Sequence, residues 1–102
     1  MSLDIAILGA EGIPKKHVSI GVDDHSRLMQ LVGESDGLLA RLNDYYADAE
    51  FENAELDNLV QEAAALRTRC RDDGRLLLFL NGVIDLAELA KREQRPLLAI
   101  SD

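Results

Sequence analysis

The sequence predicts a single α+β domain in which a small, mostly antiparallel sheet of three strands packs on three to four helices. Short segments of alternating apolar residues near both ends indicate strands, and helical spacing of leucines between them indicates helices. The length of 102 residues suits one hydrophobic core, so the domain is expected to cover residues 1–102. The expected order is ββα(α)ααβ, with an N-terminal hairpin and a C-terminal strand in one sheet and the helices on one face.

The first two strands are predicted by a period of two. Residues 3–8, LDIAIL, alternate in this way, and so do residues 16–22, KHVSIGV. Between them GAEG, at 9–12, is a turn signal, and Pro14 suits a loop or the beginning of a strand. Together these segments predict a hairpin.

Helical spacing of apolar residues follows the hairpin. Asp23 and Asp24 are good N-cap residues, and their charge suits the positive end of a helix. The spacing continues to Tyr46, although the two glycines of GESDG, residues 33–37, weaken its middle. Residues 24–46 therefore form one kinked helix or two helices in succession, and the glycines favour a break.

The second half of the chain is predicted to hold two helices and a strand. Residues 47–52 carry three acids and are expected to form a loop. Asn53 suits the N-cap of a helix that ends at residues 72–74, Asp-Asp-Gly. Residues 75–93 are apolar on nearly all sides at their start, which is typical of a buried helix. Residues 97–100, LLAI, follow a proline and are expected to be a strand that joins the N-terminal hairpin.

Composition excludes several classes of function. The net charge is −8, and with two Phe, two Tyr and no Trp the chain lacks stacking platforms for bases, so we expect no nucleic-acid partner. No apolar run approaches about 18 residues, so no membrane span is expected. The N-terminal stretch has no base before its apolar residues, unlike a secretory signal, and a cytoplasmic location is expected.

The sequence shows no convincing catalytic or metal-binding constellation. Asp23, Asp24 and His25 are types that bind divalent metals, but helix capping explains both aspartates and no second cluster completes a site. His17 and His25 have no nucleophile in a recognisable motif. Cys70 lies between two arginines that could lower its pKa, yet no base is placed to activate it. We therefore expect a protein that is not an enzyme and that holds no metal and no cofactor.

Negative charge is concentrated in residues 43–62, NDYYADAEFENAELDNLVQE. This stretch holds seven acids and no base, whereas the rest of the chain has nearly as many bases as acids. It is either a solvated surface that favours solubility or a surface that binds a basic protein. Aromatic residues among the acids favour binding, although one of the two adjacent tyrosines is expected to face the core. The candidate partner-binding residues are Asp44, Tyr45, Tyr46, Asp48, Glu50, Phe51, Glu52, Glu55 and Asp57.

The whole chain resembles the small acidic immunity proteins of bacterial toxin–immunity systems. The likeness lies in size, charge and layout, and rests on DIAILGAEGIPKKHVSIGVDDHSRL (4–28), LLARLNDYYADAEF (38–51) and QRPLLAI (94–100). The resemblance implies a cytoplasmic binding protein that neutralises a cognate toxin, and it carries no catalytic residue. The alternative is a structural or self-associating subunit, in which an edge strand and residues 97–100 pair with another copy. The sequence leaves the oligomeric state open.

Overall fold

The computed structural model describes residues 2–8, 14–33 and 37–101, and its class is the α+β that the sequence predicts. These residues form a sheet of four strands, one more than expected, and every neighbouring pair is antiparallel. The sheet has the order β2-β1-β4-β3. The strands are β1 (Leu3–Leu8), β2 (Pro14–Ile20), β3 (Ala49–Phe51) and β4 (Leu97–Ser101); the α-helices are α1 (Val22–Val32), α2 (Leu56–Arg67) and α3 (Gly74–Arg92); the short 3-10 helices are η1 (Leu38–Leu42) and η2 (Asn53–Glu55).

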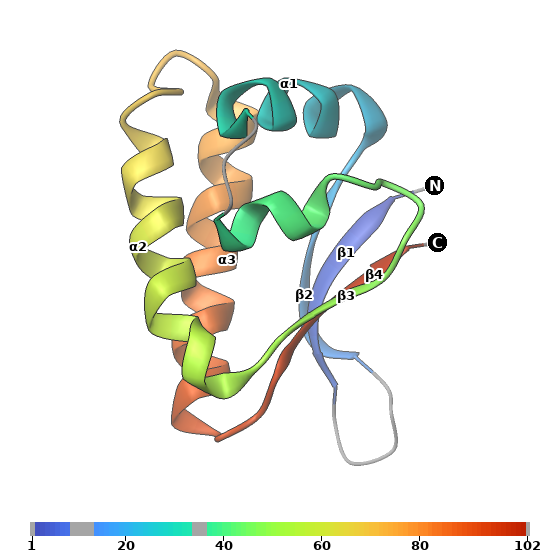
Figure 1. The fold of residues 1–102 in the computed structure, drawn as a ribbon, viewed down its shortest axis with the longest axis vertical. Helices are drawn as coiled ribbons and strands as arrows, with labels where there is room; N and C mark the ends of the chain where they lie inside the picture. Colours follow the sequence, from blue (N-terminus) through green and yellow to red (C-terminus); the bar gives the residue numbers. More distant parts are fainter. Residues whose placement is uncertain (1, 9–13, 34–36, 102) are drawn as a thin grey trace.

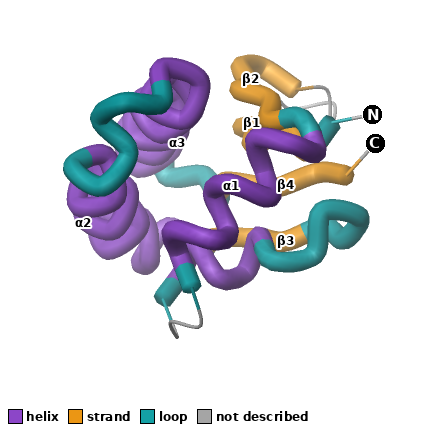
Figure 2. The backbone as a smooth tube through the Cα atoms, turned by 90° about the horizontal axis from the view of Figure 1, so that it is seen from above, coloured by secondary structure: helices purple, strands orange, loops and turns teal. Residues whose placement is uncertain are grey.

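The helices lie on one side of the sheet, as Figure 1 shows. α3 packs directly on β2, β1 and β4, and α2 packs beside α3 and against η1. Viewed from above, α1 crosses one end of the molecule and the sheet forms a separate layer (Figure 2). The face of the sheet that points toward the helices is called the core face here, and the opposite face is called the open face.

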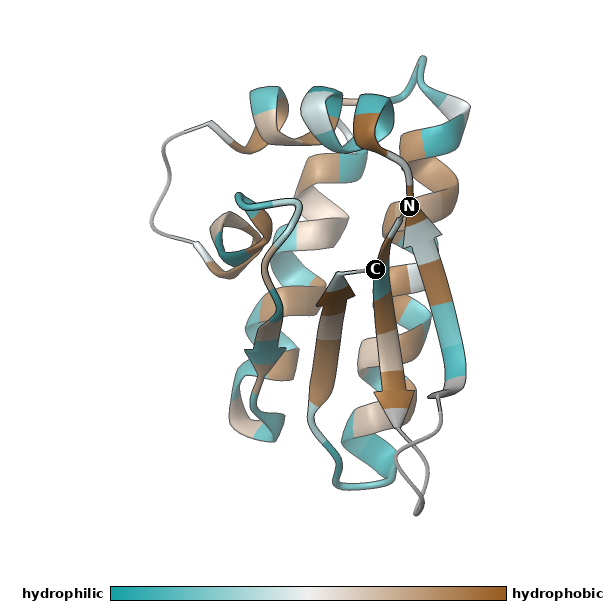
Figure 3. Ribbon diagram, turned by 90° about the vertical axis from the view of Figure 1, so that its right-hand side faces the viewer, coloured by the Kyte–Doolittle hydropathy of each residue, from teal (hydrophilic) through white to brown (hydrophobic). Residues whose placement is uncertain are grey.

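Period-two alternation sets which side chains lie on each face. On β1, Leu3, Ile5 and Ile7 are buried on the core face, as the sequence pattern predicts. Figure 3 shows the open face, which no helix covers. The open-face side chains placed by the strand register are Asp4 and Ala6 on β1, His17 and Ser19 on β2, Leu98 and Ile100 on β4, and Glu50 on β3.

The hairpin of β1 and β2 is confirmed, with different bounds for its second strand. β2 begins at Pro14 and ends at Ile20, because Gly21 is the N-cap of α1 and Val22 already belongs to the helix. The prediction that Asp23 or Asp24 caps this helix is therefore wrong, although both lie in its first turn, where negative charge stabilises a helix. The turn expected at 9–12 lies outside the described residues.

The predicted break after the first helix is confirmed, and a single kinked helix is excluded. α1 ends at Val32, and Gly33 follows with φ 68°, a left-handed conformation that favours glycine. Residues 34–36 lie outside the description. The chain then forms only the short helix η1, whose N-terminal N–H groups at Leu38 and Leu39 donate to the Glu62 carboxylate over 2.9 and 3.2 Å.

The loop predicted at 47–52 contains the fourth strand instead. β3 pairs with β4 through Ala49 and Ala99, Glu50 and Leu98, and Phe51 and Leu97. Because β4 is bonded to β1 on one side and to β3 on the other, it has no free edge. The hypothesis that residues 97–100 pair with another copy is therefore wrong.

The last two helices are confirmed, with corrected ends. The first turn after β3 begins at Glu52, not Asn53, and its carboxylate and that of Glu55 form a reciprocal capping box. α3 begins at Gly74, and Asp73, expected to help end the preceding helix, caps it by accepting from the N–H of Leu76 at 3.2 Å. Among the described residues no helix is long and apolar enough to cross a membrane.

Candidate functional site

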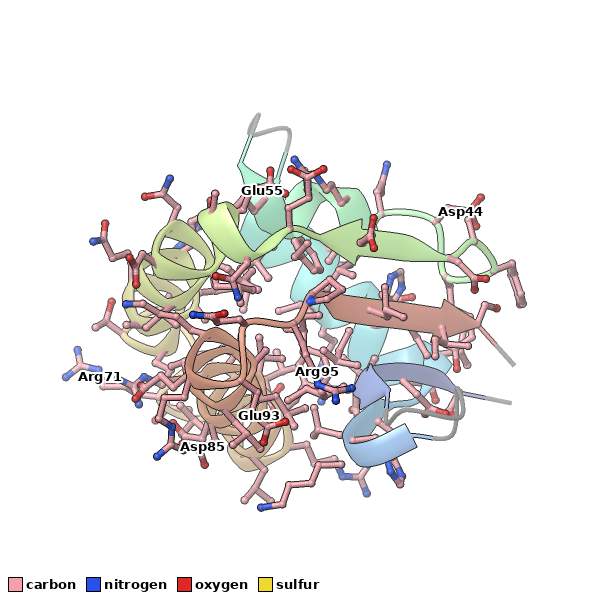
Figure 4. All side chains as sticks on the ribbon, turned by 90° about the horizontal axis from the view of Figure 1, so that it is seen from below. Asp44, Glu55, Arg71, Asp85, Glu93 and Arg95 are labelled. Carbon is pink, nitrogen blue, oxygen red and sulfur yellow. The ribbon has the colours of Figure 1, made fainter. Side chains whose placement is uncertain are left out.

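Four acidic side chains lie along β3 and the segment that leads into it, and they are called the acidic strip here. Each of the four is exposed. No lysine or arginine of the described ranges lies within 4.0 Å of their carboxylates. Figure 4 shows Asp44 and Glu55 at opposite ends of this part of the chain. The acidic strip consists of Asp44, Asp48, Glu50 and Glu52.

Two further candidate residues are paired with cations. The Glu55 carboxylate binds both terminal nitrogens of Arg41, and Asp57 lies 2.5 Å from the ammonium of Lys91. The hydrogen bonds from Arg41 lower the pKa of Glu55 to about 2. Glu55 and Asp57 therefore present less net negative charge than the sequence suggests.

Backbone contacts hold three carboxylates of the strip in place. Asp44 Oδ1 accepts from the N–H of Tyr46 at 2.9 Å, and Asp48 Oδ1 accepts from the N–H of Ser101 at 2.8 Å. Glu52 accepts from the N–H of Glu55 in the capping box. These uncharged donors fix the direction of each side chain and leave its net charge in place.

The three aromatic candidates have different environments. Tyr46 is 65% exposed beside the strip, whereas Tyr45 and Phe51 retain only 6% and 1% exposure. This agrees with the expectation that one tyrosine faces the core and the other the rim. Tyr45 and Phe51 are core residues of this fold, so the prediction that they contact a partner is wrong.

Arg41 covers the outer edge of β3. Its Nη1 donates to the carbonyl oxygen of Glu50 at 3.0 Å, and its guanidinium carbon lies 5.6 Å from the centre of the Phe51 ring. The contact with Glu50 occupies a carbonyl that an added strand would need. A partner therefore approaches the strip most easily from the open face.

On the open face the acidic strip borders a shallow groove of about 310 Å³ between β3 and β4. Asp48 and Glu50 line its acidic side, and Leu98 and Ile100, both partly exposed, line its apolar side. Figure 3 shows β4, which is largely hydrophobic, beside β3 on this face of the sheet. These two apolar residues are not among the partner-binding candidates predicted from the sequence. The alternation within LLAI, which places them opposite buried Leu97 and Ala99, is the signal that could have found them.

The aspartates and histidine considered for metal binding do not converge on one point. His25 is buried, and its Nε2 lies 2.6 Å from the carbonyl oxygen of Leu42. Asp24 lies 2.6 Å from a terminal nitrogen of Arg27, and Asp23 is exposed. The described ranges contain no group of three metal-ligating side chains.

A second cavity, of about 450 Å³, lies between α1 and the turn that joins α2 to α3. Cys70 is buried in its wall, and burial raises the pKa of the thiol, which disfavours the reactive thiolate. Arg27, also in the wall, binds the Asp73 carboxylate through Nε at 2.8 Å and Nη2 at 3.2 Å. This ion pair joins α1 to the N-terminus of α3 and gives the cavity wall a structural role.

Comparisons with known protein families, with curated proteins and with solved structures gave no match for the chain.

Proposed function

We propose that this protein is a non-catalytic binding module that docks a basic protein on the acidic strip. One observation carries the proposal: Asp44, Asp48, Glu50 and Glu52 are exposed along one strand and its approach, and none lies within 4.0 Å of a lysine or arginine of the described residues. Exposed negative charges without a salt-bridge partner attract a basic surface and speed its association.

The surroundings of the strip supply the apolar contact that a stable complex also requires. Tyr46 offers an exposed ring, a residue type that often anchors interfaces. Leu98 and Ile100 offer partly exposed apolar area beside Glu50. The charges then accelerate encounter, and the apolar groups slow dissociation.

Within this class, the best candidate is an immunity protein that acts in the cytoplasm and neutralises a cognate bacterial toxin. The resemblance in size, charge and layout described above supports this assignment. An acidic surface suits the inhibition of an effector with a basic surface, because covering that surface blocks its own partner. This chain would then inhibit the toxin by binding it, without a catalytic activity of its own.

The competing interpretation is that the strip favours solubility or discourages strand pairing at the sheet edge. Charge-neutral substitutions of the same shape discriminate between the two. We would compare wild-type protein with Asp44→Asn/Asp48→Asn/Glu50→Gln/Glu52→Gln, which retains acceptor oxygens for the backbone donors. A matched control removes four exposed charges elsewhere: Asp23→Asn/Asp72→Asn/Asp85→Asn/Glu88→Gln.

The binding measurement uses the protein encoded immediately upstream, or the protein that co-purifies from the native cell. We expect the strip variant to associate at least about 10-fold more slowly at low salt and to lose most salt dependence, while the control variant stays close to wild type. Equal slowing by both variants would show that only net charge matters, and would contradict a docking role for the strip.

A growth assay tests the immunity assignment separately. The upstream protein is expressed in cells with and without this chain, and survival is expected only when wild-type chain is present. If the upstream protein is harmless by itself, or if the chain fails to protect, the immunity assignment is wrong while the binding surface remains open to the kinetic test.

A further inference from the structure

The two edges of the sheet differ. Arg41 covers the edge formed by the three-residue strand β3, as described above. The opposite edge is formed by β2, which has seven residues. Which of its backbone groups point outward follows from the alternation of hydrogen-bond directions along an antiparallel sheet.

The direction of the hydrogen bonds is fixed at the β3 edge. Ser101 N–H points toward β3, where it meets Asp48, and Glu50 C=O points away from β4. The main-chain N–H and C=O groups of successive residues point to opposite neighbouring strands. Those of Ala99 therefore also point toward β3, and those of Leu98 and Ile100 point toward β1.

The same alternation continues across β1. Asp4 and Ala6 are the partners of Ile100 and Leu98, so their main-chain groups point toward β4. The main-chain groups of Ile5 therefore point toward Val18 of β2. On β2 the neighbours of Val18 therefore direct their N–H and C=O groups outward. These neighbours are His17 and Ser19, and in the described part of the chain no hydrogen bond reaches their four main-chain groups.

We propose that a second copy of this chain binds at β2, antiparallel, with a two-fold axis at Val18. In this register His17 of each copy faces Ser19 of the other, and each facing pair exchanges two hydrogen bonds. All four outward groups of each copy are then paired. The axis also places the two Val18 side chains together on the core face.

Charge favours antiparallel pairing of two copies. The N-terminal half of β2 carries the exposed Lys16 and His17, and the exposed Asp23 follows the C-terminal end of the strand. Antiparallel pairing brings the basic end of one copy toward the acidic end of the other. Parallel pairing would place like charges side by side.

Exposed apolar side chains lie near the same edge. Val22, directly after β2, is 50% exposed, and Leu78 on α3 is 74% exposed. Leu78 lies one helical turn before Gly82, on the side of α3 that meets Val18. A strand added beyond β2 covers this apolar area, with the methylene stem of Lys16 from the second copy above it.

Mixed cross-linking tests the register. Two variants are prepared, His17→Cys and Ser19→Cys, and each is oxidised alone and as an equal mixture. Facing residues of a hydrogen-bonded pair have Cα atoms about 5.5 Å apart, within disulfide reach. Identical positions in the two copies lie on a diagonal of about 7–8 Å, beyond that reach.

The proposal requires that the mixture form a covalent heterodimer and that each variant alone give several-fold less cross-link. Wild-type protein, which carries only the buried Cys70, is the control for background oxidation. Circular dichroism checks that both variants are folded. A mixture that does not cross-link overturns the proposal, even if the protein self-associates, because contact would then lie elsewhere.

Sedimentation of wild-type protein from about 1 μM to about 1 mM gives the second readout. We expect the mass to rise toward that of two copies as the concentration increases. His17→Pro removes one outward N–H and keeps the N–H groups bonded to β1, so it should shift the midpoint of dimer formation at least 10-fold toward higher concentration. A wild-type mass of one copy throughout the range overturns the proposal.

Discussion

The guanidinium of Arg41 binds the Glu55 carboxylate through both terminal nitrogens while Nη1 also donates to the carbonyl oxygen of Glu50. One side chain thereby joins η1, β3 and the first turn before α2. Glu55 in turn accepts from the N–H of Glu52 at 3.0 Å. This connected set of hydrogen bonds holds the backbone at Glu50 and Glu52, one end of the acidic strip, and pairs the charge of the neighbouring Glu55.

Removing the Glu55 charge should make the free energy of unfolding depend less on pH under acidic conditions. The folded pKa is about 2 and the ordinary value is 4.5, so this carboxyl stabilises the fold above about pH 4.5 and loses its contribution as pH falls toward 2. We expect Glu55→Gln to lose less stability than wild type between about pH 6 and about pH 3 in urea unfolding. Glu50→Gln, at an exposed position without an ion pair in the described residues, is the control for the loss of one negative charge.

Gly82→Ala should destabilise the protein although alanine is the better helix former. A Cβ at this position would lie 2.8 Å from Val18 Cγ2 and 3.1 Å from Val18 Cβ, so α3 would move from β2. Overpacking costs about 1–3 kcal/mol, more than the roughly 1 kcal/mol gained in helix propensity. Thermal unfolding measures the net loss.

A second glycine provides the matched control. Gly74, also in α3, has open space where its Cβ would be, so Gly74→Ala should leave stability unchanged or raise it. If Gly82→Ala stabilised the protein as well, the close approach of α3 to β2 would be contradicted.

Phe51→Ala should lower the free energy of unfolding by about 3–5 kcal/mol, because the ring is 1% exposed and its removal leaves a cavity. Tyr46→Ala removes a ring that is 65% exposed and that contacts the Tyr45 ring edge-to-face, and it should cost no more than about 1.5 kcal/mol. Chemical denaturation of both variants gives the comparison. Similar effects from the two would contradict the assignment of one ring to the core and the other to the rim.

His25 should carry its proton on Nε2, because the carbonyl oxygen of Leu42, at 2.6 Å, can only accept. Nitrogen NMR distinguishes the two ring nitrogens directly. His25→Ala should cost about 1–3 kcal/mol for the unpaired carbonyl alone, with the lost ring packing in addition. Protonation solely on Nδ1 would contradict this hydrogen bond.

Elements with a long pattern of their own could be predicted from the sequence. β1 and α3 are examples, since a period of two marks β1 and a long apolar run at helical spacing marks α3. β3 has only three residues, and it forms because β4 and the core accept Phe51. Such a strand depends on contacts about 50 residues away, which no local period reveals.

Only part of the candidate site could be predicted from the sequence, because contacts between distant residues decide the rest. Residues 43–62 contain no base, but proximity in sequence is not proximity in space. Arg41 lies just outside the stretch and pairs with Glu55, and Lys91 reaches Asp57 from α3. Aromatic residues also have two uses in a small domain, and here the core takes Tyr45 and Phe51.

The guanidinium at the β3 edge also limits how far this chain can assemble. A fibre built through strands needs two free edges on every molecule, so that each unit receives one neighbour and offers a place to the next. Here Arg41 occupies the outward carbonyl of Glu50 at one border, so a pair formed at the other border would offer a third molecule only this obstructed edge. Assembly through the sheet is then expected to stop at two copies, which would protect the protein from amyloid-like growth.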